Sequence, residues 1–490
     1  MSVNISKSRF LSGLQCSKLL WYQYNKKEDI PPYKGMQVAT FEQGHDVGEL
    51  AKNLYPDGIE VDWGVSSYDY KSGLQSTQEL LAKRVPLFEA GFSAGDVHSR
   101  ADVLVPVDKG AWDIVEVKSA TGVNEINIQD VAVQKYCYEK AGITIKNCYV
   151  MHVNSDYIRD GEINPYDLLI KDNITEKVEC FSPAVPALLE SMQNKISLCK
   201  CPEVAIGKHC LKPYTCPMKS VCWDFLPEHN TKTLPRYRGW AEDFNNGVYS
   251  LFDLDYNSLP QNYQTIYASA ETGQPYIDQA SIRDFIAKLE FPLYFLDFET
   301  MTSAVPLFDR SKPYQQIPFQ YSLHVLDSID GEARHYEFLA SGVKDPRDDF
   351  ISSLTKNLGN SGSIIVYNQS FEISRLQEAA KYYPAIQIWV DSVVSRIVDL
   401  LKPFRSQYCY HPQQHGSNSI KKVLPAWTEL SYDGMDIADG MAAASEFARV
   451  TFGEGVIDDD RNKVRSGLLK YCELDTWAMV VLLRKLYSLI

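Results

Sequence analysis

Acidic residues with metal-binding spacing occur in two separate stretches of this chain. In the first stretch, residues 113–118 read Asp-Ile-Val-Glu-Val-Lys, which places Glu116 and Lys118 two positions apart. Alternate side chains of a strand share one face, so these two groups are expected to project together. Glu116 would hold a metal ion that activates water, and Lys118 would orient that water or stabilise developing charge. Asp102, on the preceding expected strand, would complete the oxygen ligands of the ion.

The second stretch begins past the middle of the chain, where an apolar segment turns acidic. In residues 294–300, the period of a strand places Asp297 and Glu299 on one face. Carboxylates in so apolar a context are costly to bury unless they meet a cation. Near the end of the chain, the helical spacing i, i+4 brings Tyr471 and Asp475 onto one face. These residues predict a second cation site suited to phosphodiester hydrolysis.

A group of cysteines indicates a third set of ligands. Cys210, Cys216 and Cys222 follow one another with five residues between each pair, and Cys16 supplies a fourth thiol. Thiolates at this density favour metal ligation, and spacing alone leaves zinc open beside an iron–sulfur cluster. Two nearby thiols are alternative ligands: Cys199 and Cys201. The others are expected to be small buried apolar groups: Cys137, Cys148, Cys180, Cys409 and Cys472.

Helices and strands are expected to alternate around both acidic stretches. Around the first, the expected elements are a helix at 40–54, strands at 100–106 and 112–118, a helix at 128–140 and a strand at 147–153. Around the second, they are a helix at 279–289, strands at 293–298, 320–326 and 363–367, and an apolar helix from Gly467. This order predicts an α/β fold.

Composition bounds the class of protein without identifying it. The 490 residues are 45% hydrophobic and 23% charged, which is ordinary for a globular protein. A net charge of -14 argues against a surface coated in basic residues that bind a nucleic-acid duplex. Cations bound at the two acidic clusters would offset part of this negative charge. The longest apolar stretches are well short of the roughly 20 residues that span a bilayer, and the first residues lack a secretion signal. We therefore expect a cytoplasmic protein with no membrane partner, whose 11 cysteines are not disulfides.

The surroundings of the first acidic stretch resemble those of a known nuclease superfamily. An isolated Glu-x-Lys pair is usually a surface ion pair. Here His45 lies on the upstream helix, and Gln134 and Tyr138 lie on the helix that follows the strand. Together with Asp102 and the Glu-x-Lys pair, they resemble the RecB-like nucleases of the PD-(D/E)XK superfamily. That resemblance implies a restriction-endonuclease-like domain in which three residues ligate metal: His45, Asp102 and Glu116.

The same resemblance assigns roles to the remaining residues of this stretch. It implies that Lys118 is catalytic, and that Gln134 and Tyr138 position substrate or support the site. Taken alone, His45 would more often be a buried structural histidine. In RecB-like nucleases whose two ends are joined by a [4Fe–4S] cluster, one cysteine ligand precedes the nuclease core in the sequence and three follow it. The resemblance thus implies a cluster held by four thiolates: Cys16, Cys210, Cys216 and Cys222.

The second stretch resembles the DEDD exonucleases of the RNase H-like fold, in the variant with tyrosine in its last motif. Residues 365–372, an expected strand followed by a helix start, supply its middle motif. The resemblance implies two Mg²⁺ or Mn²⁺ ions held by four carboxylates: Asp297, Glu299, Glu372 and Asp475. Tyr471 would orient the attacking water. This chain has Glu372 where the family usually has Asp, and Asp399 is a spare carboxylate for which we favour a structural role.

The combination resembles a family of bacterial fusion proteins that join a RecB-like nuclease to an RNase H-like exonuclease. We expect a nuclease domain with its cysteine set at residues 1–226, a partly helical connector at 227–288 and a mixed-sheet exonuclease domain at 289–490. The leading hypothesis is a metal-dependent nuclease that acts on single strands or ends of DNA, in repair or in defence against foreign DNA. The alternatives are a ribonuclease in the last domain, or an inactive scaffold that binds nucleic acid. No ATP-binding loop of the Gly-x-x-x-x-Gly-Lys-Ser/Thr kind occurs, so any unwinding requires a helicase partner.

Overall fold

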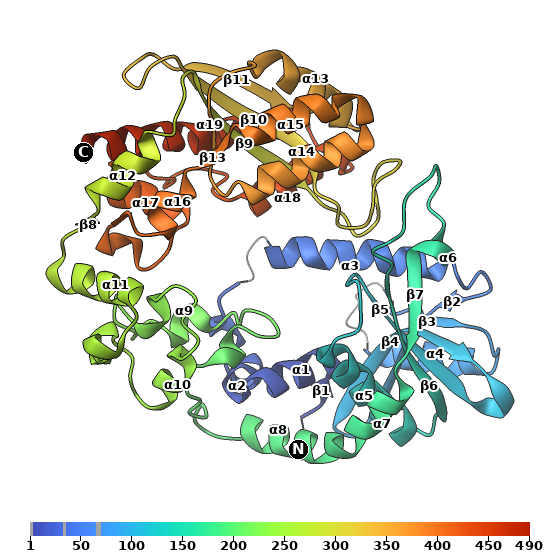
Figure 1. Cartoon of the computed structure of the whole chain (residues 1–490). Coiled ribbons are helices and arrows are strands. Elements are labelled where there is room, and N and C mark those ends of the chain that lie inside the picture. Colours follow the sequence, from blue (N-terminus) through green and yellow to red (C-terminus); the bar gives the residue numbers. More distant parts are fainter. Residues whose placement is uncertain (1–2, 33–35, 65–69) are drawn as a thin grey trace. The chain divides into compact units, whose positions relative to one another are not determined.

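The chain folds into two compact units, each built on its own mixed sheet. The computed structural model describes residues 3–32, 36–64 and 70–490 (Figure 1). The first unit comprises Met1–Asp224 and Ser303–Gln315, and the second comprises Phe225–Thr302 and Gln316–Ile490. Both combine helices with parallel and antiparallel strands, so the predicted α/β class is confirmed.

The sheet of the first unit has the strand order β2-β3-β4-β5-β6-β7, with β1 beside β4. Its strands are β1 (Ile5–Ser6), β2 (Ile59–Glu60), β3 (Leu87–Ala94), β4 (Val97–Pro106), β5 (Trp112–Lys118), β6 (Ile145–Val153) and β7 (Leu169–Asn173). Strands β3, β4 and β5 are antiparallel, whereas β5 and β6 are parallel. A parallel pair needs a crossover connection, which helix α5 (Glu125–Lys140) supplies.

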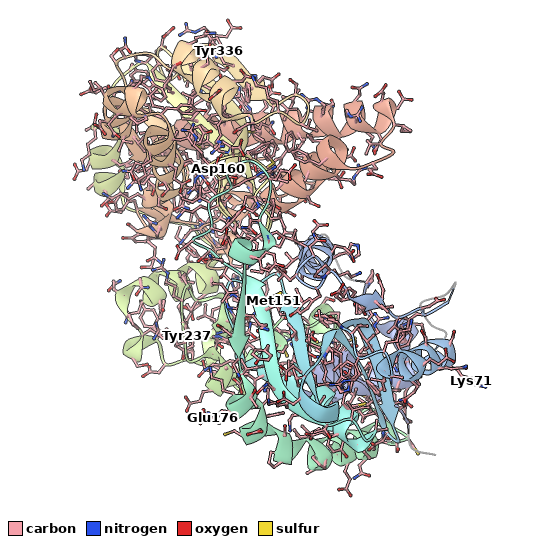
Figure 2. The ribbon with its side chains drawn as sticks, turned by 90° about the vertical axis from the view of Figure 1, so that its right-hand side faces the viewer. Lys71, Met151, Asp160, Glu176, Tyr237 and Tyr336 are labelled. Atoms are coloured by element: carbon pink, nitrogen blue, oxygen red, sulfur yellow. The ribbon has the colours of Figure 1, made fainter. Side chains whose placement is uncertain are left out.

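Helices cover this sheet, and α5 is the one most deeply inserted. The other helices are α1 (Lys7–Gln15), α2 (Ser17–Asn25), α3 (Met36–Lys52), α4 (Tyr70–Leu81), α6 (Pro165–Leu168), α7 (Thr175–Phe181), α8 (Val185–Ile196) and α9 (Lys219–Cys222). Asn124 caps α5 in a reciprocal box with Asn127, so the helix begins three residues before the predicted start. Both apolar and polar side chains of α5 are buried, which places polar groups inside the unit. Figure 2 shows Met151 within the sheet, and Lys71 and Glu176 on surrounding helices.

The loop segment Ser303–Gln315 belongs to the first unit although it follows a strand of the second. Ala304 is buried in an apolar cluster with Val47 and Met151. The Arg159 guanidinium donates hydrogen bonds to the carbonyl oxygens of Pro306 and Leu307, at 2.9 and 2.8 Å. This arrangement could not be predicted, because a loop without a helical or strand period does not show which surface it packs on.

The sheet of the second unit has the strand order β11-β10-β9-β12-β13. Its strands are β9 (Leu293–Met301), β10 (Ile317–Leu326), β11 (Arg334–Leu339), β12 (Ile364–Val366) and β13 (Ile397–Asp399). Strands β9, β10 and β11 are antiparallel, whereas β9, β12 and β13 are parallel. A separate pair joins β8 (Tyr276–Ile277) to β14 (Cys409–Tyr410). Strand β9 is therefore central, and it reads as a nearly continuous apolar run because both of its faces are covered.

Helices lie on both faces of the second sheet. The helices of this unit are α10 (Trp240–Asn245), α11 (Gln261–Thr272), α12 (Gln279–Ile286), α13 (Arg347–Asn357), α14 (Ser370–Tyr382), α15 (Gln387–Ser395), α16 (Leu401–Arg405), α17 (Ile420–Trp427), α18 (Gly440–Phe452) and α19 (Asp458–Ser488). Leu296 and Phe298 of β9 pack in the core with apolar residues of α13, α14 and α15. The opposite face meets α19, where Ser322 and His324 of β10 contact Thr476.

Residues 227–288, expected to be a connector, pack within the second unit. Leu234, Leu251, Ile266 and Tyr410 form a small buried cluster around which tyrosines of this segment gather. Its regular structure includes α10, α11, α12 and three short 3-10 turns, and such turns have no 3.6-residue period that the sequence would show. Among the described residues, no helix combines the length and the apolar character required to cross a membrane.

Candidate functional site

The first acidic stretch forms a buried charged cluster on β5 and α5. Glu116 of β5 is 1% exposed, and its Oε1 accepts hydrogen bonds from Lys118 Nζ at 2.5 Å and Lys7 Nζ at 2.7 Å. Its Oε2 accepts a hydrogen bond from Gln134 Nε2 of α5, at 2.6 Å. Asp130, one turn before Gln134, binds Lys118 Nζ at 2.9 Å. The expected projection of Glu116 and Lys118 from one face of β5 is therefore present.

Opposing charges set the protonation of this cluster. The pKa of Glu116 is raised to about 7, mainly by burial and then by the negative charges of Asp102 and Asp130. The positive charges of Lys118 and Lys7 act in the opposite direction and limit this rise. Burial alone would raise the pKa of Asp130, but the ammoniums of Lys7 and Lys118 hold it well below its usual range. Glu116 is thus the carboxyl that gains or loses a proton near neutral pH, which is a property of general bases and of metal ligands that await a cation.

The other residues predicted for this site divide into neighbours and distant groups. Asp102 Oδ2 accepts a hydrogen bond from the Val117 amide at 2.7 Å, so this carboxylate lies beside β5. Tyr138 is buried and donates its hydroxyl to the Ala90 carbonyl at 2.6 Å, which braces β3 and keeps it out of the charged cluster. His45 is exposed on α3, and no hydrogen bond or ion pair links it to the cluster in the described part of the chain. Asp102, Glu116 and the side-chain amide of Gln134 therefore lie together, whereas His45 lies outside this charged cluster.

Sequence reasoning missed two members of this cluster. Asp130 lies one helical turn before Gln134, so the spacing i, i+4 on α5 would have revealed it. Lys7 is 109 residues from Glu116 in the sequence, at the start of α1. It reaches the cluster because β1, which directly precedes it, pairs with β4. No local pattern carries that information.

The second acidic stretch forms a compact carboxylate cluster. Asp297 and Glu299 project from β9, and Asp475 projects from α19. One ligand oxygen from each of the three lies within 4.8 Å of the others. Glu372 is buried at the start of α14, and its charge raises the pKa of Asp297. Three of the four predicted carboxylates therefore converge, and Glu372 lies near enough to Asp297 for its charge to act on that group.

These carboxyls cannot all be ionised together without a compensating charge. Burial raises the pKa of Asp297 well above its usual range, and the negative charges of its three neighbours add to that effect. Burial, with Asp475 beside it, raises the pKa of Glu299 to about 8. Burial likewise raises the pKa of Glu372 to about 8 and that of Asp475 to about 6. A bound divalent cation would favour the charged forms and reverse these shifts.

One buried oxygen supports the fit of a cation to this cluster. Glu372 Oε2 is buried without a hydrogen-bond partner, although unpaired buried polar atoms are costly. Asp399, by contrast, is occupied by the backbone: its Oδ1 accepts hydrogen bonds from the Asn368 and Leu401 amides at 2.9 and 3.0 Å. Hard divalent cations bind clustered carboxylate oxygens, so the donor set has the chemistry of a Mg²⁺ or Mn²⁺ site. Asp399 lies at its border in a structural role.

Two tyrosines and a lysine border the carboxylates. Tyr471 lies one turn before Asp475 on α19 and helps to lower the pKa of that carboxyl through a hydrogen bond. Tyr432 donates its hydroxyl to Asp475 Oδ1 at 2.5 Å. Lys421 Nζ lies 5.1 Å from the centre of the Tyr471 ring, and its charge lowers the pKa of Asp475 and of Glu299. Lys421 and Lys422 both lie at the start of α17, where Lys421 faces the cluster and Lys422 is exposed.

The four predicted cysteine ligands line one cavity. Cys16 lies between α1 and α2, and Cys210, Cys216 and Cys222 surround the same space with Leu19 and Met218. Burial, together with the neighbouring thiols, raises the pKa of Cys216 to about 11, so this thiol needs a cation beside it to become a thiolate at neutral pH. Cys199 is exposed, and neither it nor Cys201 lines the cavity.

The distances between the sulfurs of these four cysteines show whether the cavity, as it stands, can hold a single metal ion. In the described part of the chain, no three of these sulfurs lie within 4.8 Å of one another. Four thiolates at about 2.3 Å from one zinc ion would lie about 3.8 Å apart. As placed, the four sulfurs are therefore too far apart to bind a single zinc ion together. Among the remaining thiols, the expectation of burial holds for Cys137, Cys148, Cys409 and Cys472 but is wrong for Cys180, which is exposed because α7 turns it outward.

Comparisons with known proteins give similarity without an activity. A family model described as a domain of unknown function (DUF2779) matches residues 294–419, which include Asp297, Glu299 and Glu372. The chain is 29% identical over 214 residues to the uncharacterized protein MG366 homolog of Mycoplasma pneumoniae, covering 40% of this chain and 32% of that protein. It is 27% identical over 239 residues to the uncharacterized protein UU173 of Ureaplasma parvum serovar 3, covering 44% and 34%. It is 30% identical over 223 residues to the uncharacterized protein MG366 of Mycoplasma genitalium, covering 41% and 33%. The chain spans about a third of the length of these relatives.

Proposed function

We propose that this protein is a metal-dependent nuclease with two separate sites that hydrolyse phosphodiester bonds of DNA. The observation that carries the proposal is the convergence of Asp297, Glu299 and Asp475 within 4.8 Å, beside the unpaired buried oxygen of Glu372. In this proposal the second unit has an RNase H-like fold of the DEDD type. The first unit has a PD-(D/E)XK fold of the RecB-like type, supported by the Glu116–Lys118 pair on a central strand and by Gln134 on the crossover helix.

In the second unit, the carboxylates would bind the divalent cations. The substrate phosphate would then approach the bound cations. Two divalent ions held there would activate water and stabilise the leaving oxygen. Tyr471, one turn from Asp475, would orient the water through its hydroxyl. Tyr432 holds Asp475 in place, and Lys421 brings a positive charge to the border of the cluster, where it would bind a phosphate oxygen.

In the first unit, Asp102 and Glu116 would hold a divalent cation. A cation would replace the ammonium groups that now satisfy Glu116 and would supply the charge that lowers the pKa of an attacking water. Lys118, released from Glu116, would orient the water or stabilise the developing charge on the phosphate. Gln134 fixes the Glu116 carboxylate through Oε2. Exonuclease activity and a preference for single strands or ends are part of the proposal, as are a cytoplasmic location and a role in repair or defence with a helicase partner.

The cysteine cavity would hold a [4Fe–4S] cluster. Cys16 precedes the nuclease core, whereas Cys210, Cys216 and Cys222 follow it, so a shared cluster would tie the two ends of the first unit together. Its role is structural in this proposal, because no residue of the charged cluster around Glu116 lines the cavity.

Labelled oligomers test the nuclease proposal directly. The full chain is incubated with Mg²⁺ or Mn²⁺ and with matched single-stranded DNA, double-stranded DNA and RNA. We expect cleavage of DNA that Glu116→Gln and Asp297→Asn each reduce in part and the double variant abolishes, whereas the exposed control Glu332→Gln cleaves normally. Cleavage of RNA alone would establish the ribonuclease alternative. Intact oligomers under all conditions would leave a nucleic-acid-binding scaffold and overturn the proposal.

A further inference from the structure

A second set of metal-ligand side chains lies on the same sheet as the carboxylate cluster. His324 of β10 and His335 of β11 are direct cross-strand partners, and their rings stack with centroids 4.5 Å apart. Glu473 of α19 approaches them from above the sheet, and one ligand atom from each of the three residues lies within 4.8 Å of the others. None of these residues has a part in the nuclease proposal.

A chain of hydroxyl hydrogen bonds is compatible with one arrangement of protons on both imidazoles. When Thr476 Oγ1 donates to the Glu473 carbonyl at 3.1 Å, it accepts from His324 Nδ1 at 2.8 Å. Thr476 Oγ1 also lies 2.6 Å from Ser322 Oγ, which must then donate to it. Ser322 Oγ consequently accepts from His335 Nε2 at 2.9 Å. The two remaining nitrogens, Nε2 of His324 and Nδ1 of His335, therefore carry lone pairs.

This arrangement is the one that supports metal-bound histidines. A ligating imidazole normally donates its other ring N–H to a polar group that fixes the tautomer and the ring orientation. Here the hydroxyls of Ser322 and Thr476 provide that support for both rings.

The distance between His335 and Glu473 fits a shared cation better than a direct bond. His335 Nδ1 and Glu473 Oε1 are 4.0 Å apart, which is too long for a hydrogen bond. Two ligand atoms at about 2.0–2.2 Å from a tetrahedral zinc ion lie about 3.4 Å apart, so a side-chain movement of about half an ångström would bring both atoms to coordination distance. His324 is buried, whereas the Glu473 side chain is 50% exposed, so the site opens to solvent on the side of α19. A water molecule would complete the coordination from that side.

We propose that His324, His335 and Glu473 form a binding site for a transition-metal cation of the zinc class. Two imidazoles and one carboxylate suit such ions, whereas the nearby cluster of oxygens suits Mg²⁺ or Mn²⁺. The ion would join β10, β11 and α19, and α19 also carries Tyr471 and Asp475. Ser322 lies opposite Asp297 across β10 and β9, so the two sites are adjacent on one sheet face. The ion would thereby stabilise the helix that completes the carboxylate cluster.

Zinc stoichiometry tests this site without any measurement of nuclease activity. The full chain is stripped with a chelator, dialysed into excess Mg²⁺ and titrated with Zn²⁺ against a chromogenic competitor. Zinc ions bound by the cysteines or carboxylates are present in every variant. Occupancy of the proposed site is therefore the difference in the number of zinc ions bound per chain between the parent chain and a variant. We expect His335→Gln to bind about one zinc ion fewer than the parent chain. We expect Glu473→Gln to bind that ion at least about tenfold more weakly, because a carboxylate ligand is lost.

A matched control and a spectrum complete the design. Glu332→Gln removes an exposed carboxylate from the turn between β10 and β11 and should bind as much zinc as the parent chain. Replacing zinc by Co²⁺ should add a visible absorption band that His335→Gln lacks. Equal zinc binding by the parent chain, His335→Gln and Glu473→Gln would overturn the proposal. That result would leave the nuclease proposal untouched, since the carboxylate cluster shares none of these three residues.

Discussion

The hydroxyl of Tyr432 donates a hydrogen bond of 2.5 Å to Oδ1 of Asp475, a residue 43 positions further along the chain. Both groups are buried, and Asp475 is one of the three carboxyls whose oxygens converge in the second unit. A hydrogen bond to the charged form of a carboxyl favours that form, and Tyr432 lowers the pKa of Asp475 in this way. Tyr432 is therefore a positioning residue that keeps Asp475 oriented and ionised.

Removing this hydroxyl should weaken cation binding. We expect Tyr432→Phe to raise the Mg²⁺ concentration needed for half-maximal exonuclease activity by about tenfold or more, as is usual when the support of a metal ligand is lost. Activity at saturating Mg²⁺ should recover in large part. The exposed Tyr336 of β11, labelled in Figure 2, supplies the control Tyr336→Phe, which should behave as the parent chain. An unchanged Mg²⁺ requirement in Tyr432→Phe would remove this role.

The stability of the metal-free protein should fall as pH rises. Glu299 and Glu372 have folded-state pKa values of about 8 against ordinary values of 4.5, so the folded state binds more protons than the unfolded state between these limits. The free energy of unfolding therefore decreases from about pH 4.5 to about pH 8 and is then constant with respect to these groups. Urea unfolding in a chelator across this range measures the slope.

Divalent cations should reverse that dependence. Mg²⁺ binds the ionised cluster and not the unfolded chain, so its stabilising effect should be small at pH 5 and largest near pH 8. Glu299→Gln removes one titrating carboxyl and should flatten the slope measured in chelator. A stabilising effect of Mg²⁺ that does not change with pH would show that these carboxyls do not bind the ion.

Short-range spacing was sufficient to predict the groups that share an element. Asp297 and Glu299 lie two apart on β9, and Tyr471 and Asp475 lie one turn apart on α19, as the strand and helix periods require. Apolar runs that end in acid also marked the correct strands. That Asp475 meets Asp297 and Glu299 was predicted only through the resemblance to a known family.

Long-range groups could not be predicted from spacing. Lys7 reaches Glu116 through the pairing of β1 with β4, and Tyr432 reaches Asp475 from a loop with no period. Tyr263 and Tyr267 of α11 pack around the small buried cluster of residues 227–288, and the pattern of that helix does not show which surface it contacts. In each case the tertiary contact decides the role of the residue, and the local sequence contains no record of it.

Lys7 should control the protonation of the first site. Its ammonium lowers the pKa of Glu116, which burial raises to about 7. We expect Lys7→Met to raise that pKa further, so that the acidic limb of the pH–rate profile moves to higher pH. The measurement uses an Asp297→Asn background, in which the second site is silent and only the first site contributes. Lys140→Met removes an exposed lysine on α5 that pairs with Asp96 and should leave the profile unchanged. A profile that Lys7→Met does not move would mean that another group limits the rate.

The cysteine cavity predicts a coloured protein. We expect anaerobically purified chain to show the broad visible absorption of an iron–sulfur cluster, and Cys216→Ser to lose most of it, because Cys216 is buried among the other three thiols. Cys201→Ser should keep the colour, since Cys201 does not line the cavity, and the exposed Cys180 provides the control Cys180→Ser. Loss of the cluster should also lower the free energy of unfolding of the first unit, because α1 and α2 would no longer be joined to the segment that carries Cys210 and Cys222. A colourless protein that binds one zinc ion through the same four thiols would assign the cavity to zinc, and colour retained in Cys216→Ser would exclude this ligand set.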